Sequence, residues 1–175
     1  MRVIGLAGWS GAGKTTLMVK LLPCLIARGH SVSTLKHAHH RFDVDKPGKD
    51  SYEHRHAGAK QVLVASGARW ALMTELRTAR EPTLRDLLDK LDPVDFVIVE
   101  GFKRDAHPKI EVNRQANQKP WMHPDMPGIV AVASDTLPPY ALPWVSLDDV
   151  EAVAGLIEAH ALAPEAIVWG AVREG

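Results

Sequence analysis

Several features that mark particular classes of protein are scarce in this sequence. Cys24 is the only cysteine, so no internal disulfide can form, and we expect the chain to work in a reducing cytoplasm. No apolar run approaches the roughly 18 residues that a membrane-spanning helix needs, and no apolar leader precedes the first predicted strand. The sequence therefore predicts no membrane partner and no export.

An excess of charge of one sign is also lacking. The 21 basic side chains are matched by 21 acidic ones, which gives a formal net charge of +0. A protein that binds nucleic acid usually carries a surplus of basic charge. We therefore expect no nucleic-acid partner.

Internal repeats, low-complexity tracts and an obvious linker are absent, which predicts a single domain over residues 1–175. Short β-rich runs alternate with helical segments, a pattern typical of an α/β fold. The predicted strands are Arg2–Ala7, Ser31–Lys36, Gln61–Ala65, Arg69–Met73, Phe96–Glu100, Ile110–Val112 and Ile129–Ala133. The predicted helices are Lys14–Ala27, Leu84–Leu91 and a segment running to about His160 after a capping box of Ser146 and Asp149. The stretch Ile167–Val172 fits either a strand or a docked tail.

The strongest motif lies between the first predicted strand and the first predicted helix. It reads Gly-Trp-Ser-Gly-Ala-Gly-Lys-Thr and satisfies the phosphate-binding pattern Gly-x-x-x-x-Gly-Lys-Ser/Thr. The loop amides and the positive end of the helix receive phosphate oxygens. Lys14 is expected to reach the terminal phosphates, Thr15 to bind magnesium, and Thr16 to touch the first phosphate. The motif predicts a site for a purine nucleoside triphosphate with magnesium, built from Gly8, Ser10, Gly11, Ala12, Gly13, Lys14, Thr15 and Thr16.

The buried strand Phe96–Glu100 has an acidic residue near each end. Ligands of parallel sheets gather beyond the carboxyl ends of the strands, so Glu100 is the candidate for the magnesium and catalytic role. Asp95, at the opposite end, is interpreted as a structural cap. Gly101 would let the backbone approach the terminal phosphate.

A polar block from Lys36 to Tyr52 follows the second predicted strand and should emerge at the same edge of the sheet as the loop. The block and the residues just after it contain five histidines: His37, His39, His40, His54 and His56. They fit a solvated loop that recognises an anionic substrate, and a zinc or nickel site is an alternative. The candidate neighbours of magnesium in this block are Asp43, Asp45 and Asp50.

Three stretches of the chain carry a resemblance to a known family. They are Gly-Trp-Ser-Gly-Ala-Gly-Lys-Thr-Thr, Lys-His-Ala-His-His-Arg-Phe-Asp-Val-Asp-Lys-Pro-Gly-Lys-Asp-Ser-Tyr, and Val-Glu-Gly-Phe-Lys. Together they resemble the MobB family of molybdopterin-guanine dinucleotide biosynthesis adapter proteins. The resemblance implies a P-loop NTPase fold, with a mostly parallel sheet between helices in three α/β/α layers.

By the same resemblance the chain is a homodimer that binds GTP with Mg²⁺ and hydrolyses it weakly. It would assist the guanylyltransferase MobA in attaching GMP to the molybdopterin cofactor. The candidate contacts to substrate or partner are Lys36, His37, His39 and His40, and Asp50 is the acid of the block nearest magnesium. Asp135, after a predicted strand, stands where related GTPases read guanine.

Three other functions stay open at this point. The histidines fit a GTPase that delivers nickel to an enzyme. The polar block would equally bind the acceptor of an ATP-dependent small-molecule kinase. An interaction module with a vestigial loop would bind no nucleotide at all.

Overall fold

The computed structural model describes residues 1–38 and 42–169. The chain divides into two compact units, a larger unit of Met1–His37 with Leu84–Gly175 and a smaller unit of Ala38–Thr83. The single domain over residues 1–175 stays a prediction beside this division. Within the described ranges, no helix is long and apolar enough to cross a membrane.

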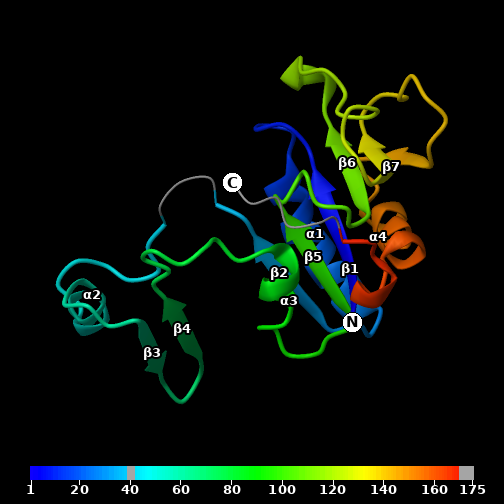
Figure 1. The fold of residues 1–175 in the computed structure, drawn as a ribbon. Helices are drawn as coiled ribbons and strands as arrows, with labels where there is room; N and C mark the ends of the chain where they lie inside the picture. The colour runs from blue at the N-terminus through cyan, green and yellow to red at the C-terminus, as the bar shows by residue number, and fades with distance from the viewer. Residues whose placement is uncertain (39–41, 170–175) are drawn as a thin grey trace. The chain divides into compact units, whose positions relative to one another are not determined.

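The larger unit is built on a six-stranded sheet in the order β2-β5-β1-β6-β7-β8. Every neighbouring pair in it is parallel, and Figure 1 shows the strands side by side. The bounds are β1 Arg2–Ala7, β2 Val32–Lys36, β5 Phe96–Glu100, β6 Lys109–Asn113, β7 Ile129–Ser134 and β8 Trp144–Ser146. The predicted α/β fold is confirmed, with β8 as a strand that the sequence pattern does not reveal.

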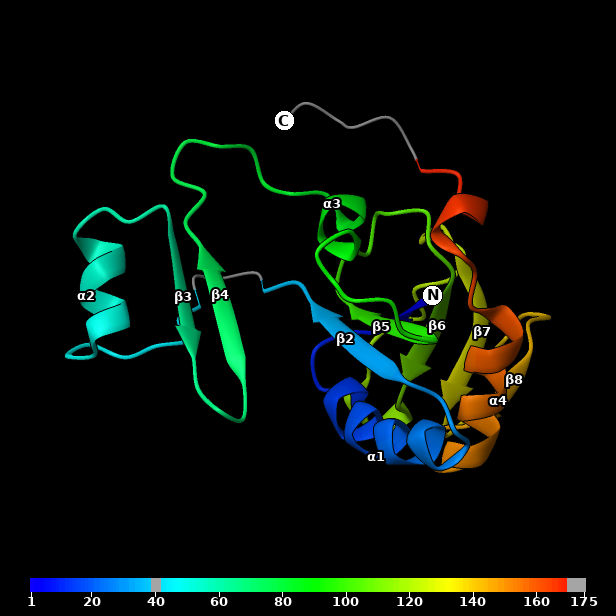
Figure 2. The same ribbon diagram turned by 90° about the horizontal axis from the view of Figure 1, so that it is seen from below.

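Helices cover both faces of this sheet. α1 (Lys14–Ala27) and α4 (Val150–His160) contact each other beneath one face, where they share a core with the sheet (Figure 2). α3 (Leu84–Leu88) packs on the other face with Val3, Val97 and Val99. The predicted three-layer arrangement is therefore observed. Because β1, β5 and β6 lie between two layers, their side chains are almost all buried.

Two predicted helix ends are wrong. α3 stops at Leu88 rather than Leu91, and the chain then turns, with the Leu91 amide donating to the Leu88 carbonyl. α4 is capped by Asp149, whose Oδ1 accepts from the Ala152 amide at 3.0 Å. Ser146 does not cap it, because Ser146 is the last residue of β8 and pairs with Ser134 of β7.

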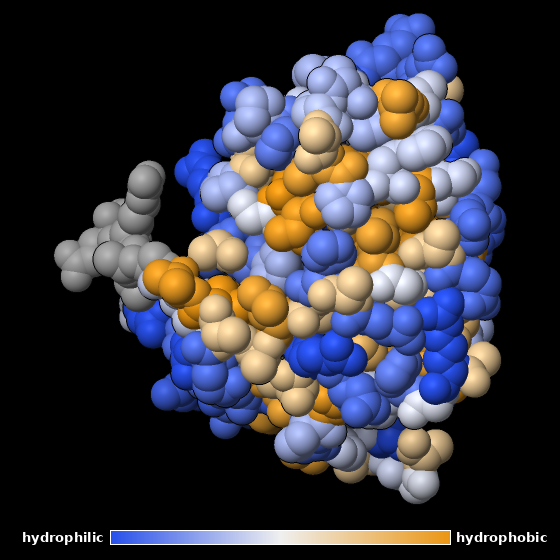
Figure 3. All heavy atoms as spheres, turned by 90° about the vertical axis from the view of Figure 1, so that its right-hand side faces the viewer, coloured by the Kyte–Doolittle hydropathy of each residue, from blue (hydrophilic) through white to orange (hydrophobic). Residues whose placement is uncertain are grey.

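The indole groups of Trp144 and Trp169 hydrogen-bond to the rest of the larger unit. Trp144 Nε1 donates to Ser134 Oγ at 2.8 Å, and Trp169 Nε1 donates to the Pro164 carbonyl at 2.9 Å. Ile167 is buried and belongs to no strand, so the docked tail is the correct alternative for the described part of that stretch. On the face shown in Figure 3, apolar surface is interspersed with polar side chains.

The smaller unit consists of α2 (Asp50–His56) and a hairpin of β3 (Gln61–Ala65) and β4 (Trp70–Thr74). The hairpin is an antiparallel sheet of its own, and α2 contacts β3. Arg55 ties the unit together through Asp43 at 2.8 Å, Asp45 at 2.5 Å and Glu75 at 2.7 Å. Hydrogen bonds from Arg55 lower the pKa of Asp45. These contacts give Asp43 and Asp45 of the polar block a structural partner in Arg55, and their approach to magnesium stays a prediction.

The segment between β5 and β6 crosses the sheet over β1. His107 from this segment is fully buried against Gly5, where a Cβ would stand 2.6 Å from Nε2. Buried Lys109 holds the segment by donating from Nζ to the carbonyls of Asp105, His107 (3.0 Å) and Pro127 (3.1 Å). Burial lowers the pKa of Lys109 to about 8 and that of His107 to about 3.

The buried imidazole predicts sensitivity to acid. Neither ring nitrogen of His107 has a hydrogen-bond partner in the described part of the chain. Since its pKa is about 3 when folded and about 6.5 when unfolded, only the unfolded chain takes up this proton between those values. The free energy of unfolding should therefore fall with acidity in that window, by at most about 1.4 kcal/mol per pH unit.

Urea unfolding at pH 7 and pH 4.5 measures this effect. His107→Leu should flatten the dependence, because it removes the titrating group and leaves no unpaired polar atom. His54→Leu, at an exposed position of α2, is the matched control and should keep the wild-type dependence. An equally steep dependence in His107→Leu would assign the acid sensitivity to other groups.

Candidate nucleotide-binding site

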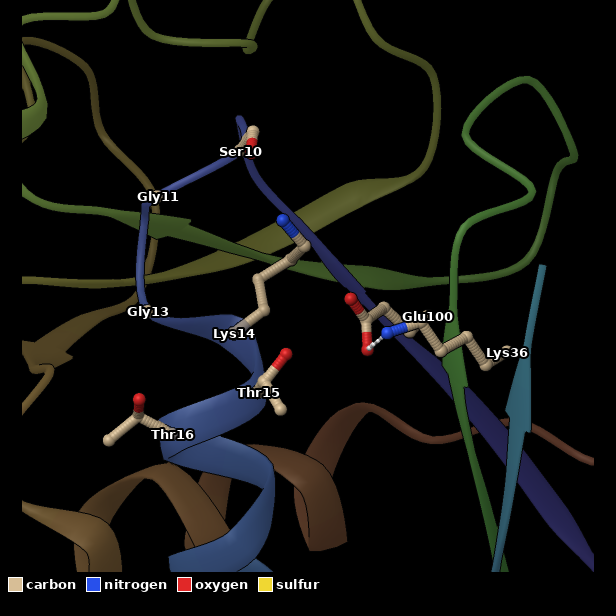
Figure 4. A pocket seen from close by; sticks show the side chains of 8 residues that line it. All are labelled: Ser10, Gly11, Gly13, Lys14, Thr15, Thr16, Lys36 and Glu100. Carbon is tan, nitrogen blue, oxygen red and sulfur yellow. Dashed lines mark ion pairs between the residues drawn. The ribbon is translucent and has the colours of Figure 1, made fainter. Parts of the chain in front are cut away.

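A pocket of about 430 Å3 opens at the carboxyl edge of the large sheet (Figure 4). All eight of its lining residues are among the predicted site residues: Ser10, Gly11, Gly13, Lys14, Thr15, Thr16, Lys36 and Glu100. They come from the loop after β1, the start of α1, and the ends of β2 and β5. The sheet thus brings together residues that lie far apart in the sequence.

The loop turns into α1 through two glycines with left-handed backbone. Gly11 has φ 82° and Gly13 has φ 93°, conformations that side chains disfavour. Gly13 occupies the cap position of α1 and offers no side chain to accept from the first amides, and no acidic residue lies in the first turn. The positive end of the helix is therefore available to an anion.

Lys14 is the first residue of α1, and its side chain turns back toward the loop. Its Nζ donates to the carbonyls of Gly8 at 2.8 Å and Trp9 at 3.0 Å. Burial lowers the pKa of Lys14, Glu100 opposes that shift, and the cations of Lys103 and Lys36 add to it. A phosphate bound in the pocket would offset both the burial and the repulsion between these cations.

Glu100 and Lys36 meet at the edge of the pocket. Paired in register on β5 and β2, they place Glu100 Oε2 3.6 Å from Lys36 Nζ, as the dashed line in Figure 4 marks. Glu100 is mostly buried, with 19% of its side chain exposed. Asp95 lies at the opposite end of β5, where it accepts from the amide and hydroxyl of Ser31. Those bonds lower the pKa of Asp95, which is the expected behaviour of a structural cap.

Gly101 lies against His37, the residue that follows β2. It has φ 100°, and a Cβ there would stand 2.5 Å from the Cβ of His37. His37 donates its amide to the Glu100 carbonyl and packs its ring against Phe102, with centroids 4.6 Å apart. Contacts of Gly101 and His37 with a ligand stay predictions.

The other predicted residues are placed as follows. Asp135 follows β7 at the same edge of the sheet, and its Oδ1 accepts from the Gln115 amide at 2.8 Å. Asp50 is the first residue of α2 in the smaller unit, so its role toward magnesium stays a prediction. His39 and His40 lie outside the described residues. In ranges 1–38 and 42–169, no three His, Cys, Asp or Glu side chains are grouped to hold a metal.

Two residues next to the loop are missed by the sequence reasoning. Asn117 Nδ2 donates to the Ser10 carbonyl at 3.0 Å. Arg114 Nε lies 3.9 Å from the position of a Cβ on Gly13. Both follow β6, the neighbour of β1 in the sheet. Their position after the carboxyl end of a predicted strand is the signal from which they could have been predicted.

The family follows from a comparison with known proteins. The family described as Molybdopterin guanine dinucleotide synthesis protein B (MobB) matches residues 3–135. The chain belongs to the MobB family. The match spans the phosphate-binding loop, Lys36, Glu100 and Asp135.

Individual MobB proteins are similar over most of the chain. The molybdopterin-guanine dinucleotide biosynthesis adapter protein of Escherichia coli (strain K12) is 44% identical over 158 residues, 89% of this chain and 90% of that protein. The adapter protein of Haemophilus influenzae is 48% identical over 120 residues, 67% of this chain and 66% of that protein.

Solved MobB structures have the same fold. The MobB homolog from Bacillus stearothermophilus has a TM-score of 0.65 and 28% identity, covering 91% of this chain and 97% of its own. A crystal structure of molybdopterin-guanine biosynthesis protein B has a TM-score of 0.70 and 25% identity, covering 90% and 98%. The resemblance seen in the sequence motifs is confirmed.

Proposed function

We propose that this chain binds GTP with Mg²⁺, hydrolyses it weakly, and serves as the adapter of the MobA guanylyltransferase when GMP is attached to the molybdopterin cofactor. The observation that supports this most is the pocket, in which the loop amides, Lys14, Thr15 and Glu100 converge in a MobB-family chain. The relatives are named adapter proteins of molybdopterin-guanine dinucleotide biosynthesis.

The residues of the pocket suit magnesium. Thr15 offers a hydroxyl and Glu100 a carboxylate, and oxygen is the ligand that this cation prefers. Magnesium in such sites is held by few protein groups together with the phosphates and water. When bound, it would neutralise charge on the terminal phosphates, while Lys14 and the loop amides hold their oxygens.

The pocket favours binding over fast catalysis. A rapid phosphoryl-transfer site positions the attacking water with a glutamine or comparable group. Glu100 is the only carboxylate in the described lining, and it is assigned to the metal and its waters. We therefore expect slow turnover, as suits an adapter.

Calorimetric titration with GTP and with ATP, each with and without Mg²⁺, tests the proposal. Magnesium-dependent GTP binding that is tighter than ATP binding would support it. A preference for ATP would point to a kinase, and absence of binding would point to an interaction module.

Asp135→Asn should narrow the difference between the affinities for GTP and for ATP if Asp135 reads guanine.

We further propose that the chain forms a homodimer through the hairpin of the smaller unit. Alternation of side chains puts Leu63, Trp70 and Leu72 on one hairpin face, where they are 60%, 65% and 47% exposed. Val62, on the other face, is buried. A two-stranded sheet with a bare apolar face is marginal in water, so a second copy would complete it.

The hairpin surface predicts the effect of one added charge. Leu72→Asp should weaken dimerisation by at least about 10-fold, because a carboxylate would be buried in an apolar contact. Sedimentation equilibrium over a concentration series measures this. Leu137→Asp, at a residue 74% exposed in the larger unit, is the control that should leave the association unchanged. Equal association of both variants would place the contact elsewhere.

A further inference from the structure

The order of strands in the sheet indicates which way a nucleotide would lie in the pocket. β5 and β2, which carry Glu100 and Lys36, lie on one side of β1, and β6, β7 and β8 lie on the other. Lys14, Thr15 and Glu100 mark the end that holds the terminal phosphates and magnesium. On the proposed function, on which this inference rests, the α-phosphate and nucleoside must therefore lie toward β6.

Arg114 lies on the β6 side of the phosphate-binding loop. It is the first residue after β6, and its Nε lies 3.9 Å from the position of a Cβ on Gly13. Its Nη2 lies 3.6 Å from Oδ1 of Asp148, in the loop between β8 and α4. With 38% of the side chain exposed, the guanidinium spans from the start of α1 toward the loop that precedes α4.

The turn after Arg114 is fixed on two sides. Asn117 donates its amide to the Arg114 carbonyl at 2.9 Å and its side chain to the Ser10 carbonyl at 3.0 Å. The Gln115 amide donates to Asp135 at the end of β7. The backbone of Arg114 is thus tied both to the phosphate-binding loop and to the predicted guanine-reading residue.

We propose that Arg114 binds the α-phosphate of the nucleotide, and that a phosphate oxygen replaces Asp148 as its partner. A long ion pair between exposed groups, such as Arg114 with Asp148, contributes little to stability. A guanidinium instead donates two parallel hydrogen bonds to one phosphate, and the amides at the start of α1 add to the attraction. Replacing Asp148 by a phosphate oxygen as the partner of Arg114 therefore strengthens nucleotide binding.

Titrations with GTP, GDP and pyrophosphate distinguish a specific contact of Arg114 with the α-phosphate from general electrostatic attraction of anions. Arg114→Ala should bind GTP and GDP about 10-fold or more weakly, by the same factor for both, since each has an α-phosphate. Pyrophosphate can occupy the terminal positions held by Lys14 and should bind the variant as it binds the wild type. Arg114→Lys keeps the charge but loses the two parallel donors, so its GTP affinity should lie between those of the wild type and Arg114→Ala. Unchanged thermal unfolding confirms that the variants are folded.

Two controls complete the test. Asp148→Asn frees the guanidinium and should raise GTP affinity, up to about fivefold. Arg85→Ala, at an exposed position on α3, should change nothing. Wild-type GTP affinity in Arg114→Ala, or an equal loss for pyrophosphate, would overturn the inference. Absence of GTP binding by the wild type would instead defeat the proposed function.

Discussion

Lys14→Ala should fold normally and bind GTP roughly 10- to 150-fold more weakly than the wild type. The factor corresponds to the loss of charge-assisted hydrogen bonds of about 1.5–3 kcal/mol. Lys14 is half-buried at the rim of the pocket, and its Nζ bonds only to loop carbonyls within the described structure. Removing it therefore leaves the core under α1 intact. Calorimetry measures the affinity, and thermal unfolding measures the fold.

Lys20→Ala is the matched control, because Lys20 is an exposed lysine of the same helix. It should bind GTP as the wild type does. Its purpose is to separate a specific contact in the pocket from the loss of one positive charge on α1. Equal affinities for Lys14→Ala and the wild type would remove the lysine from the phosphate site.

Much of the fold could be predicted because local signals agree with the tertiary structure. β1, α1, β3 and β5 have the predicted bounds, each set by a clear apolar period and a glycine or polar boundary. β8 could not be predicted, since its three residues become a strand only by pairing with β7. The division into two units was equally hidden, because residues 38–83 join the rest without a linker-like composition.

The same contrast applies to the site. The loop and Glu100 could be found because strand ends and glycine spacing are encoded locally. Gly101 could be singled out, but its close approach to His37 depends on the register of β2 with β5. Arg114 and Asn117 were missed because their contacts with the loop arise only where β6 extends past β1.

Gly8→Ala should damage both the fold and the site. A Cβ on Gly8 would stand 2.5 Å from the carbonyl oxygen of Val112, a backbone atom of β6. Main chain in the middle of a sheet cannot yield as a side-chain tip can, so the strain should cost about 1–3 kcal/mol of unfolding free energy. Because the Gly8 carbonyl also accepts from Lys14, a shifted loop should bind GTP more weakly as well. Urea unfolding and calorimetry measure the two losses.

The same substitution at Gly155 should act with the opposite sign. Gly155 lies within α4, without positive φ, and a Cβ there would meet no atom within 4 Å. Alanine at a helical position reduces the conformational freedom of the unfolded chain, so Gly155→Ala should stabilise the protein by about 0.5–1 kcal/mol. The pair isolates the approach of Val112 from the general effect of adding a methyl group. If Gly8→Ala were as stable as Gly155→Ala, the Val112 carbonyl would have to lie farther from the Cβ position of Gly8 than 2.5 Å. β6 would then lie farther from the loop, and the placement of Arg114 beside Gly13 would be wrong.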